Sequence, residues 1–144
     1  AFLGGHEMIT TTEESNARKE KGETLQMDVA AKLRAAFPQY AEDIESTPMS
    51  AHGEDIKILS AEARGAIPVS IEAKWKTSGL SNVYDAYQQA ARQAEALPSV
   101  EQITPVAVIQ QKGYDPLIVM GLEDWIALTK ELHDNSANTS GGVI

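Results

Sequence analysis

The chain has 144 residues, of which 42% are hydrophobic, so it can bury a core as one domain without disulfides or a structural metal. It has no cysteine, which excludes a disulfide framework and a thiolate zinc site. Its net charge of −9 excludes a broadly basic nucleic-acid-binding surface but permits a focused basic patch.

The N-terminus carries no signal-peptide pattern, and no apolar run approaches the roughly 20 residues of a membrane span. We therefore expect a cytoplasmic protein without membrane contact. Position 1 is Ala, and the first methionine is Met8. This order suggests that residues 1–7 are an appended leader and that a single domain spans 8–132.

A long helix is the first predicted element. Capping-box spacing between threonines and glutamates places its start near residues 10–14. One apolar stripe then repeats every four residues, at Leu25, Val29, Leu33 and Phe37. Pro38 ends the helix.

Strands and helices alternate through the rest of the chain. We expect strands over 43–48, 55–59 and 67–75, with a single helical turn at 60–65. A second long helix over 81–97, strands over 104–110 and 116–120 joined by a turn at 112–115, and a helix over 123–132 follow. The polar tail 133–144 is expected to lack regular structure. The order αβββαββα predicts an α/β fold with a mixed five-stranded sheet flanked by helices.

Three charged residues lie in apolar, strand-like runs: Asp55, Glu72 and Lys74. The alternation of a strand puts Glu72 and Lys74 on one face, and pairing with the preceding strand brings Asp55 to them. Two carboxylates with main-chain oxygens suit Mg²⁺. A lysine beside the metal can orient or deprotonate the attacking water and stabilise charge on phosphorus. The pattern predicts a site that cuts phosphodiesters.

An Asp, a variable gap and then Glu-x-Lys on a strand resembles the PD-(D/E)XK nuclease superfamily. Four motifs resemble, in chain order, the archaeal-type Holliday junction resolvases and their phage relatives: Lys21-Gly22, Ser46-Thr47-Pro48, Gly53-Glu54-Asp55-Ile56 and Ser70-Ile71-Glu72-Ala73-Lys74. The apolar segments 105–109 and 117–120 resemble the closing strands of that group. The resemblance covers about Arg18 to Leu132.

This resemblance implies a restriction-endonuclease-like fold and a Mg²⁺-dependent endodeoxyribonuclease, with Mn²⁺ as a substitute. A phage-encoded homodimer in the host cytoplasm would resolve four-way DNA junctions by paired nicks that leave 5′-phosphate ends. Asp55, Glu72 and the carbonyl of Ala73 would hold the metal, and Lys74 would assist the water. Where the resolvases have a first-helix glutamate this chain has Gln26, with Glu23 as the alternative. If Glu23 takes that role, Gln26→Glu is expected to be tolerated.

Residues expected to contact DNA are Arg18, Lys19, Lys21, Ser46, His52, Lys76 and Gln89. The side chain of Trp75, next to Lys74 on a strand, is expected to face away from the site.

Each motif also has a plain structural interpretation. Asp55 can be a turn residue, Glu72 and Lys74 an exposed ion pair, and the basic run 18–21 a solvated helix face. Two other functions stay open: a restriction- or exonuclease-type nuclease of the same superfamily, and a DNA-binding module that does not cleave. The sequence has no glycine-rich loop of the kind that binds a nucleotide, so no nucleotide cofactor is expected.

Overall fold

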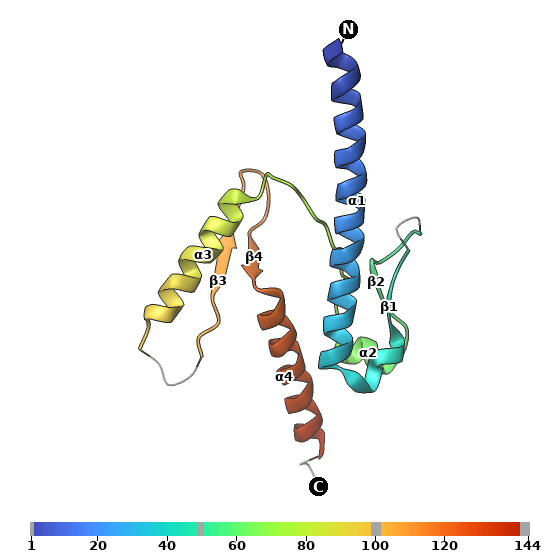
Figure 1. The fold of residues 1–144 in the computed structure, drawn as a ribbon. Helices are drawn as coiled ribbons and strands as arrows, with labels where there is room; N and C mark the ends of the chain where they lie inside the picture. Colours follow the sequence, from blue (N-terminus) through green and yellow to red (C-terminus); the bar gives the residue numbers. More distant parts are fainter. Residues whose placement is uncertain (1, 49–50, 99–101, 142–144) are drawn as a thin grey trace. The chain divides into compact units, whose positions relative to one another are not determined.

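The computed structural model describes residues 2–48, 51–98 and 102–141, with side chains described over 12–48, 51–98 and 102–138. The chain divides into two compact units, Ala1–Thr77 and Ser78–Ile144 (Figure 1). Both combine helices with one antiparallel pair of strands, so the described part of the protein is a mixed α/β structure.

Helix α1 (Phe2–Ala36) is the longest element of the first unit. The predicted apolar stripe is confirmed, because Val29, Leu33 and Phe37 are buried and Leu25 is half-buried. The helix ends where expected, before the 3-10 helix η1 (Pro38–Asp43). Its start is not at residues 10–14, as predicted, but at Phe2. In Figure 1 the N-terminal half of α1 continues past the other elements of the unit, and all side chains of residues 12–21 are exposed.

A short hairpin packs on the C-terminal half of α1. Strands β1 (Ile44–Ser46) and β2 (Ile56–Ile58) run antiparallel, with Ile44 opposite Ile58. Their isoleucines are buried, and Arg34 of α1 donates through Nε to the carbonyl of Ile44 at 2.9 Å. Burying a large apolar side chain contributes roughly 2 kcal/mol, so this cluster holds the hairpin against the helix.

Helix α2 (Ala61–Ala66) closes the core of the first unit. Ser60 caps it by accepting a hydrogen bond from the backbone N–H of Ala63 at 3.1 Å. The predicted helical turn at 60–65 is thereby confirmed. Ala63, Ala66 and Ile67 are buried, so the chain leaves the core only after Ile67.

The predicted strand over 67–75 is not formed. Among the described residues, one backbone hydrogen bond joins this segment to the residue before β2, from the N–H of Asp55 to the carbonyl of Ile71 at 3.2 Å. A single bond makes no strand ladder. The segment nevertheless has the side-chain alternation of a strand, since the even-numbered residues from 68 to 76 are exposed and the odd-numbered ones half-buried. Glu72 and Lys74 therefore lie on the same, exposed side, as predicted.

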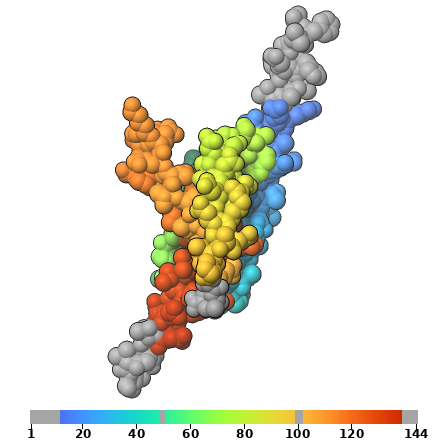
Figure 2. All heavy atoms as spheres, turned by 90° about the vertical axis from the view of Figure 1, so that its left-hand side faces the viewer, coloured from blue at the N-terminus to red at the C-terminus, as the bar shows by residue number. Residues whose placement is uncertain are grey.

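The second unit contains helix α3 (Ser81–Ala96), strands β3 (Val106–Ile109) and β4 (Leu117–Met120), and helix α4 (Leu122–Gly141). The strands pair antiparallel as predicted, and Gly113 takes a positive φ of 90° in their turn. The helix α3 contacts the hairpin, where Ala107 is buried, and in Figure 2 the orange hairpin tip stands clear of the yellow helix.

Helix α4 extends well beyond the predicted 123–132. Residues 133–141 continue the helix, so the expectation of an irregular tail is wrong for them, while 142–144 lie outside the described residues. In the described parts of the chain the four strands form two separate pairs, and a five-stranded sheet is not shown. None of the helices over these residues has the length and apolar character needed to cross a bilayer.

Candidate active site

A pocket with a volume of about 370 Å³ lies in the first unit. One wall is a single face of α1, made by Ser15, Arg18, Lys19, Gly22 and Gln26. The opposite wall comes from later in the chain and consists of Pro48, Ala51, Asp55 and residues Glu72, Ala73, Lys74 and Trp75. The pocket thus gathers Asp55 with the Glu-x-Lys motif, although 16 residues separate them in the sequence.

Asp55 joins the segments that form the pocket. It follows Gly53, whose φ of 109° allows the turn that glycine accepts without strain. Its carbonyl accepts from the N–H of Thr47 at 2.9 Å, and its Oδ2 accepts from the N–H of Ala73 at 2.7 Å. The other carboxylate oxygen, Oδ1, has no hydrogen-bond partner among the described residues. One oxygen therefore anchors the side chain, and the other can bind a ligand.

Glu72 and Lys74 line the pocket with exposed side chains. Neither forms an ion pair or side-chain hydrogen bond within the described parts of the chain. The alternative interpretation of these two residues as an ion pair is not supported by this geometry. Both side chains can reach a ligand.

Gln26 is buried, with 3% of its surface exposed. Its Nε2 donates to the hydroxyl of Ser46 at 2.9 Å and to the carbonyl of Thr47. Because a carbonyl only accepts, the nitrogen of the amide must be on this side. Oε1 therefore lies on the other side of the amide group. In the described residues every fully buried side-chain oxygen has a hydrogen-bond partner, and Oε1 has none, so Oε1 is not fully buried. Gln26 is one of the residues that line the pocket.

The alternative first-helix residue, Glu23, is exposed and does not line the pocket. Of Gln26 and Glu23, only Gln26 lines the same pocket as Asp55 and Glu72.

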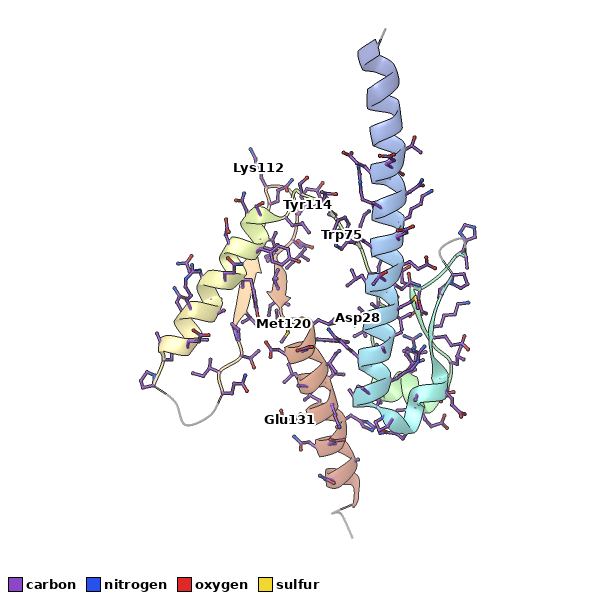
Figure 3. The ribbon with its side chains drawn as sticks, in the orientation of Figure 1. Asp28, Trp75, Lys112, Tyr114, Met120 and Glu131 are labelled. Carbon is purple, nitrogen blue, oxygen red and sulfur yellow. The ribbon has the colours of Figure 1, made fainter. Side chains whose placement is uncertain are left out.

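Two of the predicted DNA-contacting residues, Arg18 and Lys19, line the pocket. Arg18 also pairs with Glu14 one turn earlier, at 3.7 Å. Lys21 lies with its Nζ 4.6 Å from the centre of the Trp75 ring, a cation–π contact. The expectation that Trp75 faces away from the site is wrong, because the ring turns toward α1 and lines the pocket (Figure 3).

The other predicted DNA-contacting residues lie outside the pocket lining. Ser46 is bonded to Gln26 and half-buried, whereas His52 and Lys76 are exposed. Gln89 is exposed on α3 in the second unit. The sequence interpretation also missed two contacts of Glu54 beside the site. The first is the hydrogen bond from the Thr47 hydroxyl to its carbonyl, and the second is its ion pair with Arg64. No spacing rule pairs residues ten positions apart, so the sequence held no signal for the second.

The donor atoms at this pocket fit a hard divalent cation. The described residues contain no group of three or more His, Cys, Asp or Glu side chains placed to hold a metal. A cation here would have two carboxylates, Asp55 and Glu72, with the neutral Oε1 of Gln26 and water. Mg²⁺ binds in this way, with one or two carboxylates and several waters or phosphate oxygens.

Comparisons of the chain with protein-family models, with curated proteins and with solved structures find no match. The resemblance to PD-(D/E)XK nucleases therefore rests on the motif residues and on their placement around one pocket.

Proposed function

We propose that the chain is a metal-dependent endodeoxyribonuclease of the PD-(D/E)XK type that nicks branched DNA. One observation carries this proposal: a single pocket joins Asp55, Glu72 and Lys74 with basic residues of α1. The first three supply the charges needed to cut a phosphodiester, and the basic residues supply charges that attract it.

Each residue has a distinct role in the proposed reaction. Bound Mg²⁺ supplies Lewis acidity toward the phosphate and lowers the pKa of water. Asp55 and Glu72 hold it, with Oε1 of Gln26 and the carbonyl of Ala73 as neutral donors. Lys74 orients the attacking water and stabilises the charge that develops on the phosphate oxygens.

The charge at the pocket differs from the net charge of −9 of the whole chain. The pocket lining carries three basic side chains, Arg18, Lys19 and Lys74, and two acidic ones, Asp55 and Glu72. The lining residues therefore carry one more positive than negative side chain, although Arg18 also pairs with Glu14 outside the lining. A divalent cation adds to this, and the site can attract a phosphate although the whole chain is acidic.

The finer features belong to the same proposal. They are a restriction-endonuclease-like fold and a homodimer. A four-way junction has two-fold symmetry, so two sites on a symmetric dimer can place paired nicks across it.

Cleavage of a panel of substrates tests the proposal. Incubated with Mg²⁺, the protein should nick a synthetic four-way junction faster than linear duplex, single-stranded or flap DNA. Asp55→Asn and Glu72→Gln should each reduce cleavage by about 100-fold or more while junction binding is retained. Glu42→Gln is the matched control, because Glu42 is exposed and lies outside the pocket lining.

The same panel separates the alternatives. Preferred cutting of linear duplex would favour a restriction-type enzyme, and release of nucleotides from ends an exonuclease. Junction binding without any cutting would favour a DNA-binding module. An Asp55→Asn variant that cleaves at the wild-type rate would contradict the site assignment.

A further inference from the structure

Arg64 of α2 bonds to two separate segments of the chain. Its Nη2 donates to both carboxylate oxygens of Glu54, at 2.9 and 3.2 Å, and its Nη1 donates to the carbonyl of Val69 at 2.6 Å. The side chain of Arg64 is 36% exposed and that of Glu54 32%, so this contact is partly shielded from water. A planar group with several fixed donors suits such a double contact, which an ammonium group cannot reproduce.

The two segments bonded by Arg64 are those that carry the carboxylates of the pocket. Glu54 directly precedes Asp55, and Val69 lies three residues before Glu72. Arg64 itself does not line the pocket. Its effect on the site must therefore pass through the backbone of these segments.

Glu54 also connects Arg64 to the opposite wall. Its carbonyl accepts a hydrogen bond from Oγ1 of Thr47 at 2.7 Å. The carbonyl of Thr47 in turn accepts from Nε2 of Gln26. A continuous series of hydrogen bonds thus runs from Arg64 to α1.

Residues 67–75 need such support, because they lack the ladder of a strand. Within the described residues, two further hydrogen bonds join this segment to the Asp55 turn: one from the N–H of Asp55 to the carbonyl of Ile71, and one from the N–H of Ala73 to the carboxylate of Asp55. The bond from Ala73 occupies one carboxylate oxygen of Asp55, a residue of the proposed site. The backbone bond and the two contacts of Arg64 leave the carboxylates of Asp55 and Glu72 free to bind a ligand, and Arg64 is the side chain among these connections.

We infer that Arg64 is a positioning residue that sets the spacing between Asp55 and Glu72 for cation binding. This inference rests on the proposed function, in which these two carboxylates hold a divalent cation. Charge alone predicts the opposite: the positive Arg64 repels a cation bound between the two carboxylates, so removing this charge would strengthen cation binding. The sign of the change in cation affinity therefore separates positioning from charge.

Terbium luminescence gives a readout that does not depend on cleavage. Tb³⁺ is a hard cation that takes oxygen ligands, and Trp75 in the pocket lining can sensitise its emission. The full chain is titrated with Tb³⁺, and Mg²⁺ is then added as a competitor. Asp55→Asn identifies the signal that comes from this site.

Arg64→Gln should weaken Tb³⁺ and Mg²⁺ binding by about 10-fold or more, the effect of losing a group that orients metal ligands. Arg64→Lys keeps the charge but loses the forked contact, so it should also weaken binding. The matched control is Lys57→Gln, which removes a positive charge close to Asp55 in the sequence but outside the pocket lining. It should leave affinity unchanged or raise it slightly.

Thermal melting followed by circular dichroism fixes a temperature at which each variant is folded, and all titrations are made there. Unchanged or tighter binding by folded Arg64→Gln overturns the inference. If Arg64→Gln does not fold, Arg64→Lys carries the test, and wild-type affinity in that variant overturns it. An absence of Asp55-dependent Tb³⁺ binding in the wild type would instead contradict the proposed function itself, and the inference with it.

Discussion

The amide nitrogen of Gln26 lies 2.9 Å from the hydroxyl of Ser46 and donates to it, so α1 is bonded by side chains to the end of β1. The same nitrogen donates to the carbonyl of Thr47. The contact with the Thr47 carbonyl needs a donor at this position, whereas the Ser46 hydroxyl can itself donate. Glutamine supplies one, and an ionised glutamate does not.

Gln26→Glu should therefore destabilise the protein. A buried carboxylate would face the Thr47 carbonyl and leave it without its donor, which costs about 1–3 kcal/mol in the free energy of unfolding. This replaces the expectation from sequence that a glutamate is tolerated here. Urea denaturation in EDTA measures the loss, with Glu23→Gln as the exposed control on the same helix. Equal midpoints for the Gln26→Glu variant and the wild type would show that the amide donor is unimportant.

Phe37→Ala should be the more severe change. Phe37 is fully buried at the end of the apolar stripe, and truncating such a side chain costs about 3–5 kcal/mol. Met27→Ala on α1 should change stability little, because Met27 is 57% exposed. Denaturant midpoints compare the two. A similar loss in both variants would be inconsistent with the core described here.

Cleavage should depend on the kind of divalent cation. Mg²⁺ and Mn²⁺ should support nicking of a four-way junction. Ca²⁺ should support binding without turnover, since its coordination is larger and less regular. Gel assays of binding and cleavage in each cation, with EDTA as the blank, measure this. Full activity in excess EDTA would rule out the metal mechanism.

Neutralising Arg18 and Lys19 together should weaken junction binding. Both line the pocket, and each lost phosphate contact lowers the slope of log K against log salt by about 0.9 for duplex DNA. Binding titrations at several salt concentrations measure the slope for Arg18→Gln/Lys19→Gln. Lys57→Gln, outside the lining, should leave it unchanged. An unaltered slope in the double variant would remove these residues from the DNA-binding surface.

The sequence predicts those parts of the fold in which a periodic pattern coincides with burial. The stripe through Val29, Leu33 and Phe37 identifies the buried face of α1, and the isoleucines of β1 and β2 identify the first hairpin. The grouping of Asp55 with Glu72 and Lys74 also follows from the sequence. Alternation along residues 68–76 keeps the two motif side chains on one side even without a strand ladder.

Features that depend on neighbours distant in the sequence are missed. The Trp75 ring turns to the pocket because Lys21 of α1 lies over it, a contact between residues 54 positions apart that alternation cannot indicate. The strand over 67–75 is overpredicted, since its β-branched residues say nothing about whether a partner backbone is aligned with it. The C-terminal part of α4, residues 133–141, runs through polar residues, where no apolar period marks a helix.

The pocket wall on α1 has a consequence for insertions. Ser15, Arg18, Lys19, Gly22 and Gln26 share one face of a continuous helix. One residue inserted between Gly22 and Gln26 would rotate everything before it by about 100° and turn both basic side chains away from the carboxylates. An insertion of seven residues would restore the direction but move them about 10 Å along the axis. Arg18 pairs with Glu14 of the same helix, so the phase and length of α1, rather than a bond to the hairpin, set where positive charge lies over the site.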